Sequence, residues 1–206
     1  MRVATAVCLM LVTAVAGAGT EHAPPAGFVP NSETAVKIAE AMLLPIYGEK
    51  RVESAKPFSA HLKDGVWYVD EKLCEIGPPF EADVKIEVCK GDWLEVQLSE
   101  RDAHAISITV GMTNPAPGER PKEGFVPDSA TAVKIGEAVL APVYGKKQIE
   151  SERPFAAKLN DKVWNVYGSL NCPDGKGGIT SECDGGVAGV ELSKADGHVL
   201  NIGHGK

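Results

Sequence analysis

Residues 27–48 read GFVPNSETAVKIAEAMLLPIYG, and residues 124–145 read GFVPDSATAVKIGEAVLAPVYG. An ungapped comparison that continues this match to Val69 and Val166 gives 27 identical residues in 43 positions. Similarity of this extent at a fixed shift of 97 residues indicates a tandem duplication within the chain of 206 residues.

The segment between the two copies is rich in proline, with three prolines and a glycine in nine residues, and reads as a stiff, extended connector. We therefore expect one unit over residues 24–112, the connector over 113–121 and a second unit over 122–206. Each unit is long enough for a small domain with a thin core.

Both copies predict a helix followed by antiparallel strands. Asn31 and Asp128 follow a proline at the position of a helix N-cap, and apolar residues then recur at helical spacing up to Ile46 and Val143. Pro45 and Pro142 should close or kink each helix near its end, with Gly48 and Gly145 just beyond. After the helix the apolar residues alternate with polar ones, as in a half-buried strand. The predicted fold class is α+β: two tandem repeats, each with one helix packed on a curled antiparallel sheet of four to five strands.

The beginning of the chain predicts export. Arg2 precedes an almost wholly apolar run, and Ala16-Gly17-Ala18 fits a small-residue cleavage site, so we expect a signal peptide over residues 1–18. The apolar run is shorter than a membrane-spanning helix, and we expect no membrane insertion after cleavage. The net charge of −7 argues against binding to nucleic acid. The predicted location is the periplasm.

Cleavage would leave four of the five cysteines: Cys74, Cys89, Cys172 and Cys183. Four cysteines in an oxidising compartment suggest two disulfides, with three possible pairings. Their places in the two copies make one local bridge per unit, Cys74–Cys89 and Cys172–Cys183, the simplest of the three. Their spacing does not fit a zinc site, and we expect no metal.

The sequence contains no nucleophile motif, P-loop or dinucleotide fingerprint, and we expect neither a cofactor nor a catalytic site. His104 and His198 fall before the last strand of each copy, and we interpret them as exposed turn residues. Tyr47 and Tyr144 are expected to pack the end of the helix on the sheet. A sheet-lined pocket is the alternative to a packed interior.

The charge is unevenly shared between the copies. Residues 27–112 contain nine Lys and Arg against fifteen Asp and Glu, and residues 124–206 contain nine against ten. The additional acids gather in the second half of the first copy, at Glu71, Glu75, Glu81, Asp83, Glu87, Asp92, Glu95, Glu100 and Asp102. They are either a solvated face or a surface that steers a basic protein partner, for which Trp93 would be an anchor. The predicted partner-binding residues are Glu87, Asp92, Trp93 and Glu95.

The repeated pattern, from Gly-Phe-Val-Pro through Thr-Ala-Val-Lys-Ile and Pro-x-Tyr-Gly to Val-Trp-x-Val, resembles the YbbC/YhhH-type immunity family. The ending around Gly185-Gly186-Val187 and His204-Gly205-Lys206 resembles it too. The first copy departs from the pattern at Gly91-Asp92-Trp93 and lacks the terminal His-Gly-Lys. The resemblance implies a nuclear-transport-factor-2-like fold in each copy and a place in bacterial polymorphic toxin systems.

The function that this resemblance implies is that of a non-enzymatic protein that binds and neutralises a cognate protein toxin. Export suggests a toxin that acts from the periplasm, such as a cell-wall-degrading effector. Two alternatives remain open at this point. One is a PepSY-like envelope module that restrains a protease, and the other is a small-molecule-binding or isomerase-like protein with a sheet-lined pocket.

Overall fold

The computed structural model describes residues 24–71, 74–76, 87–89, 93–110, 121–181 and 183–205. The predicted signal peptide (1–18), residues 113–120 of the predicted connector and Asp92 lie outside these ranges. Among the helices that are described, none has both the length and the apolar character needed to cross a membrane.

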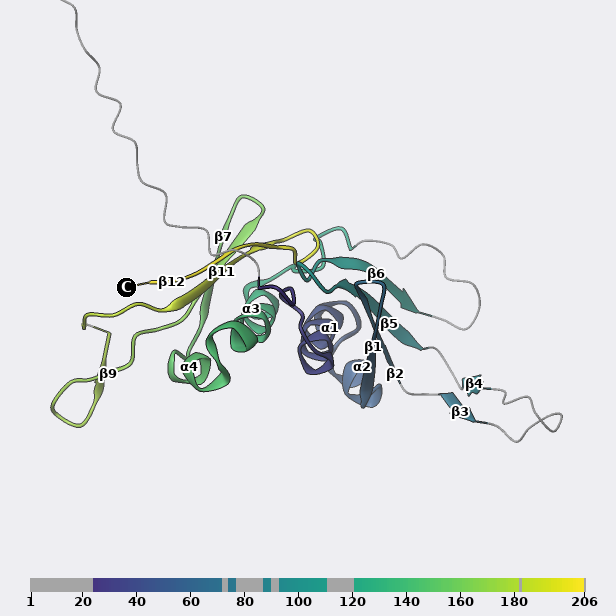
Figure 1. The fold of residues 1–206 in the computed structure, drawn as a ribbon, viewed down its shortest axis with the longest axis horizontal. Helices are drawn as coiled ribbons and strands as arrows, with labels where there is room; N and C mark the ends of the chain where they lie inside the picture. The colour runs from purple at the N-terminus through teal and green to yellow at the C-terminus, as the bar shows by residue number, and fades with distance from the viewer. Residues whose placement is uncertain are drawn as a thin grey trace, which may run out of the picture.

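Among the described residues, the first repeat has two helices and two sheets. Helices α1 (Ser32–Tyr47) and α2 (Glu49–Ser54) precede a four-stranded antiparallel sheet in the order β1-β2-β5-β6. Its strands are β1 (Phe58–Lys63), β2 (Val66–Glu71), β5 (Leu94–Ser99) and β6 (Ala105–Val110). A separate hairpin of β3 (Cys74–Ile76) and β4 (Glu87–Cys89) extends beyond the end of β2 (Figure 1).

The second repeat has the same order of elements. Helices α3 (Ser129–Tyr144) and α4 (Lys146–Ser151) precede a sheet in the order β7-β8-β11-β12. Its strands are β7 (Ala156–Asn160), β8 (Val163–Tyr167), β11 (Ala188–Ser193) and β12 (Val199–His204), and the small hairpin is β9 (Cys172–Pro173) with β10 (Ile179–Thr180). The predicted α+β fold of two similar repeats is thereby confirmed.

The Gly-Phe-Val-Pro motif attaches the start of each helix to the sheet. Phe28 and Val29 donate backbone hydrogen bonds to the turn between β5 and β6, at Arg101 O (3.1 Å) and Glu100 O (3.0 Å). Gly27 has a φ of +70°, and a Cβ there would lie 2.3 Å from Glu100 O, so no larger residue fits. The second repeat uses the same arrangement.

The predicted N-caps are confirmed, as are the prolines near the helix ends with a glycine just beyond, but a short second helix that was not predicted follows each of them. The side chains of Asn31 and Asp128 accept the N–H of Thr34 (2.9 Å) and Thr131 (2.8 Å). Pro45 lies inside α1, which ends only at Tyr47, and the short helix α2 follows. This short helix has no apolar periodicity in the sequence because Val52 is its only buried residue.

The two repeats share one hydrophobic core. Helices α1 and α3 contact each other at the centre of the molecule, and each is covered on one side by its own sheet (Figure 1). Two reciprocal hydrogen bonds join the sheets, from Ala105 N to Asp196 O (2.7 Å) and from Val199 N to Asp102 O (2.8 Å). These are equivalent positions, so the repeats are related locally by a pseudo-two-fold axis. Buried residues of both repeats form a single continuous cluster.

Candidate functional site

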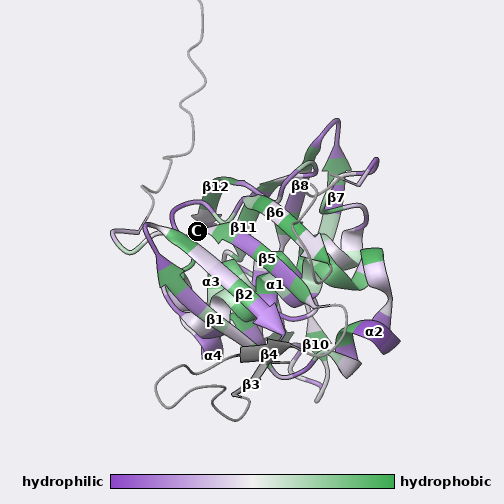
Figure 2. Ribbon diagram, turned by 90° about the vertical axis from the view of Figure 1, so that its right-hand side faces the viewer, coloured by the Kyte–Doolittle hydropathy of each residue, from purple (hydrophilic) through white to green (hydrophobic). Residues whose placement is uncertain are grey.

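The outer face of the first sheet carries one of the predicted partner-binding residues. Along β5, Leu94, Val96 and Leu98 are buried against the helix, and the residues between them are only half-buried. Figure 2 shows hydrophobic and hydrophilic residues alternating along β5. Glu95 lies on the outer face, where its carboxylate accepts a hydrogen bond from Gln97 (2.8 Å).

A second carboxylate stands next to Glu95. Asp70 on β2 is directly opposite Glu95 in the strand register. It accepts a hydrogen bond from the Ser59 hydroxyl (2.7 Å), and its other oxygen lies 3.7 Å from Nδ1 of His61, which stacks on Tyr68. We call this set the acidic sheet face: Ser59, His61, Tyr68, Asp70 and Glu95.

The second sheet does not repeat this face. Tyr167 and Gly189, which are opposite each other in the register of β8 and β11, take the places of Asp70 and Glu95. A shallow hollow of about 250 Å³ lies over Gly189, and Tyr167 on its wall is 46% exposed. The pair of opposed carboxylates is therefore a property of the first repeat.

The structure places the other predicted partner-binding residues separately. Trp93 is half-buried directly before β5, on the side of the strand that continues the outer face. Glu87 is on β4, in the small hairpin rather than in the main sheet. Asp92 is outside the described residues. Glu95 is therefore the predicted residue that the structure places in the acidic sheet face, and Asp70 is a neighbour that sequence reasoning missed.

Two acids of the predicted surface are engaged in contacts within the protein. Glu71 is only 6% exposed and forms a two-point ion pair with Arg51 of α2, at 2.7 and 3.3 Å. Asp102 is hydrogen-bonded to the ring of His104 at 2.7 Å. Burial alone would raise the pKa of Asp102, but hydrogen bonds from Ser99 and His104 outweigh it and hold this pKa below its usual value.

The two turn histidines meet across the boundary between the repeats. The rings of His104 and His198 are 6.2 Å apart, and Asp102 lies between them, with its second oxygen 3.6 Å from Nε2 of His198. Both histidines lie in the loop before the last strand of their repeat and are about 40% exposed, as predicted. Their pairing was missed because it depends on how the repeats pack.

The second repeat has a buried carboxylate that no pattern in the sequence indicates. Glu152, which is 4% exposed, accepts hydrogen bonds from the backbone N–H of Ala188 (2.6 Å) and from Gln148 (2.6 Å). Its side chain also contacts His204 (3.1 Å). It fills the space beside Gly168, the position equivalent to Glu71, so both repeats bury a carboxylate at the same end of the sheet. Each is fully paired, which is typical of a structural role.

The cysteine prediction is confirmed in the second repeat, where Cys172 and Cys183 form a disulfide. In the first repeat the backbone places Cys74 directly opposite Cys89 in the β3–β4 register. Opposed residues of antiparallel strands have the Cα separation that a disulfide needs, so the Cys74–Cys89 bridge stays our prediction.

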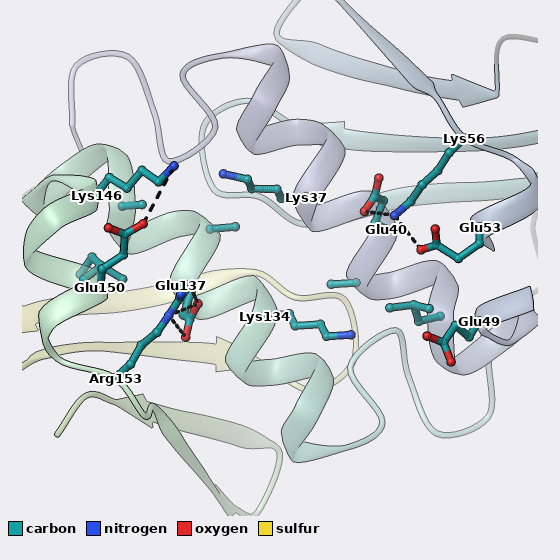
Figure 3. A pocket seen from close by; sticks show the side chains of 15 residues that line it. Lys37, Glu40, Glu49, Glu53, Lys56, Lys134, Glu137, Lys146, Glu150 and Arg153 are labelled. Carbon is teal, nitrogen blue, oxygen red and sulfur yellow. Dashed lines mark hydrogen bonds and ion pairs between the residues drawn. The ribbon is translucent and has the colours of Figure 1, made fainter.

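A groove of about 600 Å³ runs between the helices of the two repeats (Figure 3). Its apolar lining comes from both repeats: Ala41, Leu44, Ala138, Ala141 and Ile149. Sequence reasoning missed this groove, although every charged residue in its lining falls at a position that the duplication repeats. We call it the inter-repeat groove.

The charged lining of the inter-repeat groove consists of five pairs of equivalent residues. Four pairs keep their charge in both repeats: Lys37 and Lys134, Glu40 and Glu137, Glu53 and Glu150, Lys56 and Arg153. The fifth pair, Glu49 and Lys146, reverses it. Figure 3 shows Lys134 pointing across the groove toward Glu49, whereas Lys37 points toward Lys146.

Several of these charges neutralise each other. Lys56 pairs with Glu40 (3.2 Å) and Glu53 (2.7 Å), and Arg153 forms a two-point pair with Glu137. Near the lysine pair, the hydrogen bond and charge of Lys37 lower the pKa of Glu33, and Lys146 from the other repeat adds to the effect. Lys37 and Lys146, which come from different repeats, therefore both act electrostatically on Glu33.

A family model and a curated relative match this chain. The family model described as "NTF2 fold immunity protein" matches residues 34–93 and 131–206, more than half of the chain. The chain is also 29% identical over 89 residues to a protein of Escherichia coli (strain K12) named "Uncharacterized protein YhhH". That match covers 43% of this chain and 64% of YhhH, so the chain spans less than two thirds of its relative. No solved structure gives a significant match.

Proposed function

Because the chain belongs to the NTF2 fold immunity protein family, with one match in each repeat, we propose that it binds and neutralises a cognate protein toxin. Neutralisation by binding requires a surface complementary to the toxin and no chemistry of its own. The exported location predicted from residues 1–18 would place the encounter in the periplasm. Targets there include peptidoglycan and the membrane, and we propose a cell-wall-degrading effector as the partner.

The acidic sheet face is the observation that supports this binding mode most directly. Asp70 and Glu95 stand side by side on an open sheet, and neither is repeated in the second repeat. Paired carboxylates on such a surface attract a basic partner, speed its association and disfavour acidic competitors. The half-buried Trp93 at the same strand supplies an aromatic anchor of the kind that dominates binding energy in interfaces.

The proposal is tested by capture and rescue. The tagged protein is purified from the periplasm of its native host, the bound protein is identified, and that protein is expressed in the periplasm of a sensitive host. We expect growth to stop unless this chain is co-expressed. A captured protein that is harmless in every compartment would refute the immunity function, and a captured protease would favour the envelope-module alternative.

Point variants then test the surface. Glu95→Lys should slow association with the toxin several-fold at low salt, with a smaller effect at high salt, because steering by surface charge is screened. Glu191→Lys, the same change on the outer face of β11, is the matched control and should leave the rate nearly unchanged. Equal effects of the two variants would assign Glu95 to solubility rather than recognition.

A further inference from the structure

The inter-repeat groove is electrically polarised along its length. One end of the groove has three cations, Lys37, Lys146 and Arg153. The same end has two anions, Glu137 and Glu150. The other end contains Lys56 and Lys134 against Glu40, Glu49 and Glu53, which is two cations and three anions. Among the lining residues this polarity comes from one difference between the repeats, Glu49 against Lys146. Glu33, which lies outside the lining and pairs with Lys37 at 2.6 Å, offsets part of the positive charge.

We propose, as an inference that rests on the proposed function, that the inter-repeat groove binds a peptide segment of the partner protein in one direction. An acidic side chain of that segment would lie at Lys37 and Lys146, and a basic side chain at Glu49. An apolar residue between them would cover the lining formed by Ala41 and Leu44 of one repeat and Ala138 of the other.

The lysines that would recognise the segment can change their ion-pair partners with little loss of free energy. Lys146 is 76% exposed and lies 4.0 Å from Glu150, and Lys37 is 50% exposed in its pair with Glu33. Exposed pairs of this kind contribute little, so either lysine can exchange its partner for a carboxylate of the bound segment. Neither Glu49 nor Lys134 forms a salt bridge with another described residue.

The shape and chemistry of the groove fit a peptide. A volume of about 600 Å³ lies within the range of pockets that enclose a ligand. Its lining combines apolar and charged side chains of both repeats, so a bound chain would bury an apolar side chain and keep its own charges paired. A partner with one sign of charge throughout would meet repulsion at one of the two ends.

Two synthetic pentapeptides of the same composition test the direction. Acetyl-Glu-Ala-Leu-Ala-Lys-amide and acetyl-Lys-Ala-Leu-Ala-Glu-amide are titrated into the isotope-labelled full chain and followed by NMR. One of them should bind about fivefold more tightly than the other, because two weak charge contacts are made in one orientation and lost in the reverse. The amides of α1 and α3 that line the groove should shift.

The charge-swapped variant Glu49→Lys with Lys146→Glu inverts the polarity at constant net charge, so it should reverse the preference. Lys158→Glu with Glu191→Lys, a matched swap on the outer face of the second sheet, should leave it unchanged. Equal binding of both peptides, no binding, or a preference that survives the groove swap would overturn the inference. The peptide measurement needs no toxin, so a negative result would refute the groove inference without refuting the proposed function. Conversely, if the wild type failed to neutralise a toxin, the proposed function would be refuted while the peptide result would still hold.

Discussion

Gly136 offers a sharp test of how closely α3 packs on its sheet. A methyl group added there would lie 2.8 Å from Cγ1 of Val166 and 3.1 Å from Cγ1 of Val190. Both contacts are shorter than van der Waals distance, and the χ1 of valine has little freedom to relieve them. The equivalent residue in the first repeat is Ala39, which is fully buried. The same helix position therefore tolerates a methyl in one repeat and excludes it in the other.

The magnitude follows from two opposed effects. Gly to Ala in the interior of a helix stabilises by about 1 kcal/mol, whereas overpacking a core costs about 1–3 kcal/mol. We expect Gly136→Ala to lower the free energy of unfolding by about 1 kcal/mol. The reciprocal change, Ala39→Gly, loses helix propensity and a buried methyl, about 2 kcal/mol in all.

The measurement is urea unfolding followed by far-UV circular dichroism. The cost of Gly136→Ala should shrink or change sign in a Val166→Ala background, because the smaller residue removes the contact while the helix propensity stays. If Gly136→Ala alone stabilises the protein by the full helix-propensity gain, α3 does not pack on β8 and β11 as closely as described, and our reasoning is wrong.

Two further predictions concern stability. Cys172→Ser should lower the free energy of unfolding by about 3 kcal/mol, the chain-entropy value for a bridge that spans 11 residues. In urea unfolding, the double variant with Cys172→Ser and Cys183→Ser should lose the same amount. An unchanged unfolding midpoint would contradict a stabilising bridge. Asp102→Asn should destabilise the protein at neutral pH, and this effect should be lost in acid. The reason is that the lowered pKa of Asp102 stabilises the folded state above about pH 4, and this contribution disappears as the pH falls through the pKa of the folded state. Asp196→Asn, at the equivalent position, is the control: thermal melts at pH 7 and pH 3 should separate the two variants only at pH 7.

Local features of the fold could be predicted where one residue or one short pattern determines them. Asn31 and Asp128 cap their helices because a side-chain oxygen at that position satisfies a free N–H, a rule that needs no tertiary information. The alternation along β5 likewise predicts which residues face the helix. The short helix α2 was missed because it buries one residue and leaves no periodic signal.

The candidate site was less predictable because it depends on contacts between distant segments. Glu71 reads as a surface acid until the partner Arg51 is placed beside it. The inter-repeat groove exists only because α1 packs against α3, which neither copy of the repeat specifies by itself. One signal was available in the sequence: position 49 is Glu in the first copy and the equivalent position 146 is Lys.

The reciprocal bonds between Ala105 and Asp196 and between Val199 and Asp102 give the molecule the architecture of a dimer whose subunits are fused. In an assembly of two identical polypeptides, any substitution would be imposed on both sides of the axis at once, and positions 49 and 146 would carry the same residue. Fusion into one gene lifts that constraint, because each half can acquire changes separately. A symmetric ancestor with identical halves could not have had an inter-repeat groove with two different ends. It also could not have carried the acidic sheet face on one half alone.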